Sequence, residues 1–160
     1  MKHNFQPQFL FPLDKKEQMF YNDIERQVNM KKDLEKEEIA KSFRKYARFG
    51  LDREGLDPLR VLQVIDVCFA SQKNKLDMLA VLDTMRLLEL NGEGECASAV
   101  RAVYFATATH RLAKNEITRR IRRHATENYC DERTVYRRLA RAKELYLKVR
   151  AKENSIVFDL

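Results

Sequence analysis

Residues 131–142, Asp-Glu-Arg-Thr-Val-Tyr-Arg-Arg-Leu-Ala-Arg-Ala, predict a short amphipathic helix with a strongly basic outer side. Asp131 is a good N-cap, because its carboxylate can accept a hydrogen bond from a free backbone N–H group of the first turn. The apolar residues recur at helical spacing and form one stripe, which consists of Val135, Leu139, Ala142, Tyr146 and Val149. A helix that buries such a stripe and exposes arginines in its first two turns suits the major groove of DNA.

A second helix is predicted just before this one, over residues 114–126, with Ile117, Ile121 and Ala125 on its inward side. The connection Thr126-Glu127-Asn128-Tyr129-Cys130 then leads to Asp131. A helix, a short turn and a capped basic helix are the layout of a helix-turn-helix, in which the second helix enters the major groove. The sequence therefore predicts a helix-turn-helix over about residues 114–152.

The positive charge of the chain is concentrated in the same region. The net charge of the whole chain is +7. Residues 1–108 contain 17 Lys and Arg and 17 Asp and Glu, whereas residues 109–152 contain 14 Lys and Arg against 5 Asp and Glu. Ten of those 14 cations are Arg, which binds guanine edges and phosphates in a forked geometry better than Lys does. This distribution favours a nucleic-acid partner over a merely solvated basic face.

The stretch from Asp131 to Ala142 resembles the "S-x-R-T-V-Y-R-x-L-x-R-A" recognition helix of phage-type helix-turn-helix regulators. These include the RinA/ArpU-like late-gene regulators and domains similar to the −35-reading part of sigma factors. The resemblance covers about residues 112–152 and is strongest over the last dozen of the motif. The family usually has a small residue, often Gly, two positions before the cap, where this chain has Tyr129. We therefore expect a turn longer than that of the compact motif.

The resemblance implies that three residues face DNA: Arg133, Thr134 and Arg137. Two of them, Arg133 and Arg137, lie one helical turn apart, so each could bind a guanine edge. Phosphate contacts, which give affinity without sequence information, are predicted for Arg119, Arg120, Arg122, Arg123, Arg138, Arg141 and Lys148. Tyr136 has two interpretations: packing beside Val135, which we favour, or a hydroxyl contact to a phosphate.

The rest of the chain predicts an all-α fold. Four Gly and three Pro in 160 residues, with abundant Leu, Ala, Glu, Lys and Arg, favour helices throughout. Further helices are expected over residues 15–49, 58–70, 74–90 and 95–108. The helix that begins at Pro58, after the N-cap Asp57, is apolar on nearly all sides and is predicted to be the central core helix.

Three regions follow from these elements. Residues 1–56 form an N-terminal arm and a long polar helix that contacts a partner or another copy. Residues 57–152 form the helical core, which ends in the helix-turn-helix, and residues 153–160 form a tail. In the arm, Phe5, Phe9 and Phe11 are expected to be buried, because monomers rarely expose so apolar a patch.

Other kinds of site have little support in the sequence. His3, His110 and His124 have no partners at metal-ligand spacing, and His124 is expected on the basic surface. Gly92-Glu93-Gly94 lacks the strand, the Lys and the Ser or Thr of a phosphate-binding loop. We therefore expect neither an enzyme, nor a bound metal, nor a cofactor. The three cysteines are expected to be reduced and mostly buried, and no apolar run approaches the ~18 residues of a membrane span.

These observations favour a sequence-specific double-stranded DNA-binding regulator of phage or prophage type, acting in the bacterial cytoplasm. Two alternatives stay open: a phage small terminase subunit or other DNA-packaging protein, and a helical protein-binding module such as an antirepressor or an inhibitor of a host enzyme. RNA polymerase, another acidic protein and a second copy of the chain stay open as further partners.

Overall fold

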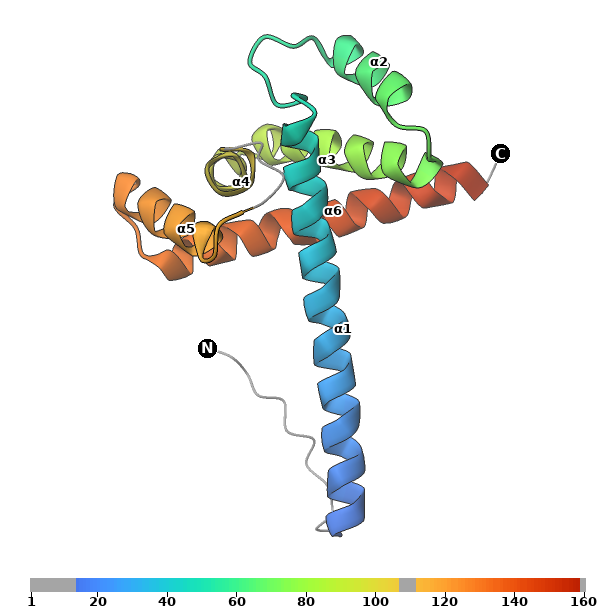
Figure 1. Ribbon diagram of the computed structural model, residues 1–160, viewed down its shortest axis with the longest axis vertical. Helices are drawn as coiled ribbons and strands as arrows, with labels where there is room; N and C mark the ends of the chain where they lie inside the picture. Colours follow the sequence, from blue (N-terminus) through green and yellow to red (C-terminus); the bar gives the residue numbers. More distant parts are fainter. Residues whose placement is uncertain (1–13, 107–111, 159–160) are drawn as a thin grey trace. The chain divides into compact units, whose positions relative to one another are not determined.

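The computed structural model describes residues 14–106 and 112–158, all of whose regular elements are helices (Figure 1). The α-helices are α1 (Lys15–Arg48), α2 (Pro58–Cys68), α3 (Gln72–Leu90), α4 (Gly94–Val100), α5 (Glu116–Glu127) and α6 (Glu132–Phe158). A π-helical segment, η1 (Arg101–Phe105), continues directly from α4. The predicted all-α fold is confirmed. The prediction that Phe5, Phe9 and Phe11 are buried falls outside the described residues.

The chain divides into two units, residues 1–36 and residues 37–160. Helix α1 contributes residues 15–36 to the first unit and residues 37–48 to the second. The second unit thus includes the last part of α1, because Ile39, Phe43 and Tyr46 are buried in its core. These three side chains follow the charged segment of the helix.

The start of α1 is fixed by a capping box between Asp14 and Glu17. The backbone N–H of Glu17 donates to Asp14 Oδ1 at 2.8 Å, and the backbone N–H of Asp14 donates to Glu17 Oε2 at 3.1 Å. Such a reciprocal pair satisfies two N–H groups at the helix start. The helix then continues to Arg48, as predicted for residues 15–49.

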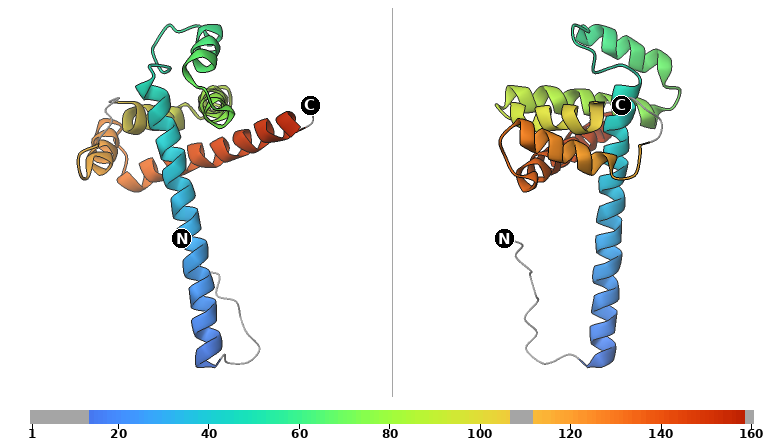
Figure 2. Two further views of the ribbon diagram at one scale, coloured as in Figure 1. Left: turned by 45° about the vertical axis from the view of Figure 1, so that its right-hand side comes forward. Right: turned by 60° about the vertical axis from the view of Figure 1, so that its left-hand side comes forward.

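The core of the second unit lies where α3, α4 and α6 pack side by side (Figures 1 and 2). Phe43 of α1 is fully buried, and its ring centroid lies 5.8 Å from that of Tyr104 and 5.7 Å from that of Tyr146. This aromatic cluster joins residues from α1, η1 and α6. Aromatic pairs at such distances stabilise a core beyond the burial of their surface.

The prediction that the helix from Pro58 is the central core helix is wrong. Helix α2 lies at the edge of the second unit in both views of Figure 2, and its buried side chains are Val61 and Ile65. Leu59 and Val67 are 67% and 83% exposed. The predicted start is confirmed, since Asp57 Oδ1 accepts a hydrogen bond from the N–H of Leu59 and Pro58 occupies the first turn. An apolar composition on all sides predicted burial, but α2 packs chiefly against one helix, α3.

The cysteines also differ from the prediction. Cys68 is exposed, while Cys96 and Cys130 are partly buried, and all three are free thiols. Among the described residues, no helix is long and apolar enough to cross a membrane.

Candidate nucleic-acid interface

Helices α5 and α6 are joined by the four residues Asn128–Asp131. The backbone N–H of Cys130 donates to the carbonyl of Ala125 at 3.0 Å, and the N–H of Tyr129 donates to the carbonyl of Thr126 at 3.3 Å. These two hydrogen bonds form a Schellman motif, which requires a left-handed residue after the helix end. Tyr129 is that residue, with a φ of +51°.

The expectation of a longer turn is therefore wrong. Tyr129 adopts the backbone conformation that glycine adopts most easily, so the turn stays within the three to four residues typical of two helices joined in this way. Its side chain can be large because it is 99% exposed and meets no neighbouring element.

We expect Tyr129→Gly to raise the free energy of unfolding by about 0.5–1 kcal/mol, because the left-handed conformation is strained for a residue with a Cβ atom. Urea denaturation would measure the change. Glu127→Gly is the matched control, since Glu127 is exposed in the last turn of α5, where glycine should destabilise by a similar amount. Equal destabilisation by both variants would contradict the assignment of strain to Tyr129.

The start of α6 is capped as the sequence predicts. Asp131 Oδ1 accepts a hydrogen bond from the backbone N–H of Thr134 at 2.7 Å. A hydrogen bond from the Thr134 side chain and, after it, the one from the Thr134 backbone N–H hold the pKa of the Asp131 carboxyl below its ordinary value. The negative charge that results at neutral pH also interacts favourably with the helix dipole.

The inward sides of the two helices pack as predicted. Ile121 and Ala125 of α5 are buried, as are Val135, Leu139 and Ala142 of α6. On α6 the buried stripe continues through Tyr146 and Val149. Because this stripe fixes the rotation of α6, it also determines which of the arginines are exposed to solvent.

The predicted base-contacting residues lie on the first two turns of α6. Arg133 and Arg137 are exposed, and Thr134 is partly buried. Arg137 Nη2 donates a hydrogen bond to Thr134 Oγ1 at 3.1 Å, which links two of the three residues. Tyr136 is 49% exposed beside the buried Val135, so half of its surface is available to a partner.

Three of the predicted phosphate-binding arginines are exposed on α5. Arg119 pairs with Glu116 at 3.2 Å, and Arg122 pairs with Glu132 at 3.1 Å, while both side chains stay more than half exposed. Arg123 is exposed as well. Exposed ion pairs stabilise a protein little, so Arg119 and Arg122 can exchange these carboxylates for phosphates at small cost.

Arg120 cannot serve as a phosphate contact in this structure, which corrects that prediction. Its side chain is 5% exposed, its Nη1 donates to the carbonyl of Val103 at 2.9 Å, and its Nε pairs with Glu116 at 3.1 Å. The neighbouring His124 is also buried, whereas the sequence placed it on the basic surface. Both residues lie on the side of α5 that faces η1, so helical periodicity of the apolar residues alone did not identify them as buried.

Arg138 and Arg141 of α6 are engaged by acidic residues from the start of α4. Arg138 Nη2 lies 2.7 Å from Glu95 Oε2, and Arg141 binds both carboxylate oxygens of Glu93, at 2.8 and 3.0 Å. These pairs hold α6 against α4, so Arg138 and Arg141 are less available to phosphates than the sequence predicts. Lys148 pairs with Glu144 at 3.0 Å and is exposed. Sequence reasoning missed Glu93 and Glu95, which lie more than 40 residues from their partners.

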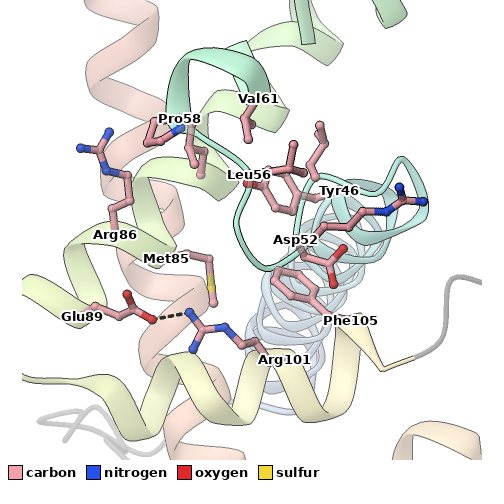
Figure 3. Close-up of a pocket in the computed structure, with 13 residues that line it drawn as sticks. Tyr46, Asp52, Leu56, Pro58, Val61, Met85, Arg86, Glu89, Arg101 and Phe105 are labelled. Atoms are coloured by element: carbon pink, nitrogen blue, oxygen red, sulfur yellow. Dashed lines mark hydrogen bonds and ion pairs between the residues drawn. The ribbon is translucent and has the colours of Figure 1, made fainter. Parts of the chain in front are cut away.

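A cavity of about 230 Å³ lies elsewhere in the second unit (Figure 3). It is enclosed by α3, by η1 and by the loop that precedes α2. Tyr46, Leu56, Met85 and Phe105 give it an apolar lining. Its mouth carries charges of both signs, from Asp52, Arg53, Arg86 and the ion pair between Arg101 and Glu89. The Tyr46 phenol is uncharged at neutral pH, and burial raises its pKa still further above that range. This balance of charges makes the cavity a poorer anion site than the α5–α6 surface.

A groove of about 570 Å³ lies between α3 and α6, and its apolar lining consists of Leu87, Leu90, Leu145 and Val149. Its rim also mixes acidic and basic residues. Glu153 lies at this rim, and burial, with a smaller contribution from Asp83, raises the pKa of its carboxyl to about 7. In the part of the chain that the structure describes, no cluster of His, Cys, Asp and Glu could hold a metal ion.

The α5–α6 surface thus exposes Arg119, Arg122, Arg123, Arg133 and Arg137 around one short turn. No family model, no curated protein and no solved structure matches this chain. The chemistry of the exposed arginines on α5 and α6 is what bears on function.

Proposed function

We propose that the chain binds double-stranded DNA, with α5 and α6 acting as a helix-turn-helix and the first turns of α6 in the major groove. One observation carries the proposal: Arg133 and Arg137 are exposed and lie one helical turn apart. Val135, which lies between them, and Leu139, which follows them, are buried. The guanidinium groups therefore extend from a helix whose rotation is fixed by the core. Arginine held in this way can bind a guanine edge through two hydrogen bonds.

The contact that Arg137 makes supports reading of bases rather than general attraction to DNA. The hydrogen bond from Arg137 to Thr134 restricts the guanidinium before DNA arrives, so less side-chain entropy is lost on binding. Thr134 keeps a hydroxyl at the same surface, which can contact a base edge or a phosphate. Arg133, Thr134 and Arg137 are the proposed base-contacting residues.

Phosphate contacts are proposed for Arg119, Arg122 and Arg123 on α5 and for Lys148 further along α6. All four side chains are exposed. Backbone contacts of this kind fix the position of a reading helix on the duplex and supply most of the salt-dependent affinity. The positive charge of residues 109–152 also supports DNA as the partner, because this segment contains 14 Lys and Arg but only 5 Asp and Glu.

The biological setting rests on the resemblance of residues 131–142 to phage-type regulators. We propose a transcription regulator of phage or prophage type that acts in the bacterial cytoplasm without a cofactor. A DNA-packaging protein would use the same arginines but would not select one DNA sequence. A protein-binding module would direct the basic surface at an acidic protein, such as RNA polymerase, and would not bind duplex DNA.

Salt titrations of duplex binding test the phosphate contacts. Arg119→Ala and Arg122→Ala should each weaken binding to all duplexes alike and flatten the dependence of log K on log salt by about one unit. Arg60→Ala, at an exposed arginine of α2, is the matched control and should leave the slope unchanged. The same loss of slope in all three variants would mean that the slope follows the net charge of the chain rather than contacts on α5. No binding at about 50 mM salt, where even unspecific contacts are strong, would remove the DNA proposal in favour of a protein partner.

A further inference from the structure

Helix α1 carries an apolar stripe within the first unit. The other described residues of that unit do not bury this stripe. Phe20, Ile24 and Val28 follow one another at intervals of four residues, and they are 64%, 41% and 46% exposed. Residues at this spacing lie on one side of a helix. Met19 and Met30 are equally apolar and about two-thirds exposed, but their spacing places them on another side of α1.

A helix of this kind gains most of its stability from packing its apolar side against another element, rather than from helix propensity. Residues 15–36 are helical throughout, yet all of the described side chains among them are exposed. The apolar stripe therefore marks an interaction surface, and the charges beside it indicate what binds there.

Residues of opposite charge flank the stripe at its two ends. Glu17 lies seven residues before Ile24, and Lys32 lies eight residues after it; both are exposed. In an antiparallel pair of α1 helices that cross at Ile24, Glu17 of each copy would lie near Lys32 of the other. In a parallel pair the same residues would face their own counterparts, which places like charges together.

We propose that the stripe of Phe20, Ile24 and Val28 binds the same stripe of a second copy, with the two α1 helices antiparallel and crossing at Ile24. Phe20 of one copy then packs against Val28 of the other, and the pairing of Glu17 with Lys32 occurs twice. The interface uses only residues of the first unit, so it is independent of DNA binding.

The mass of the full-length chain in solution tests the pairing. Sedimentation of the parent should give twice the 19.0 kDa of one chain. Ile24→Gln with Val28→Gln should raise the Kd of the dimer at least about tenfold. Met19→Gln with Met30→Gln is the matched control, with the same chemical change on another side of α1, and should keep the parent's mass.

A monomeric parent would overturn the proposal, because the stripe would then be covered within one chain or by another partner. A dimer that survives Ile24→Gln with Val28→Gln would overturn it too, by placing the interface elsewhere. Unchanged thermal melting of the second unit in all variants confirms that a loss of mass is not a loss of folding.

Cysteine cross-linking tests the orientation, in a Cys68→Ser background that removes the exposed native thiol. A mixture of Phe20→Cys and Val28→Cys chains should form a disulfide between the two variants, and neither variant alone should cross-link. Efficient cross-linking of each variant with itself would show a parallel pair and overturn the antiparallel arrangement.

Discussion

Leu139→Ala is expected to lower the free energy of unfolding by about 2–5 kcal/mol. Leu139 is 3% exposed and belongs to the core that includes Ile121 and Ala125 of α5. Truncating it removes apolar burial and leaves a cavity beside the turn, and both effects destabilise the folded state. Urea denaturation with a two-state fit would measure the change.

Leu147→Ala on the same helix is the matched control. Leu147 is 47% exposed, so the same truncation should cost much less there. Equal effects of the two variants, or no effect of Leu139→Ala, would mean that α6 is rotated relative to the structure and that Arg133 and Arg137 point elsewhere.

Arg120→Met is expected to lower the free energy of unfolding by about 1–3 kcal/mol, because the Val103 carbonyl and the partly buried Glu116 carboxylate lose a hydrogen-bond donor. Methionine keeps much of the packing volume, so the loss reports mainly on the polar contacts. Arg119→Met is a close control, since Arg119 pairs with the same Glu116 from an exposed position.

The Arg119 variant should stay within about 0.5 kcal/mol of the parent. If instead the two variants were equally stable and equally impaired in duplex binding, Arg120 would be a phosphate contact after all. The pair of variants therefore separates an arginine that stabilises the fold from one that is available to DNA.

The parts of the site that depend on local sequence could be predicted. The cap at Asp131, the stripe of Val135 and Leu139, and the exposure of Arg133 and Arg137 all follow from helical periodicity and capping chemistry within a dozen residues. These features depend on neighbours along the chain, which a single sequence displays directly.

The parts that depend on distant segments could not be predicted. Glu93 and Glu95 engage Arg141 and Arg138 from α4, and no local pattern marks such pairs in advance. Helix α2 shows the same limitation. Its apolar composition indicated that the helix is buried, but it did not indicate that Leu59 and Val67 lie on the side away from α3. Tyr129 is a different case, because its turn is local: the Schellman hydrogen bonds to the carbonyls of Ala125 and Thr126 form although Tyr129, and not glycine, takes the left-handed position.

Selection of bound duplexes from a random pool, followed by titration of the selected and a scrambled duplex, tests the central claim most directly. The parent should prefer the selected duplex, and Arg133→Ala or Arg137→Ala should each cost about 1–3 kcal/mol on that duplex and much less on the scrambled one. Recovery of no common sequence, or equal losses on both duplexes for the two variants, would contradict the reading of bases by the first turns of α6.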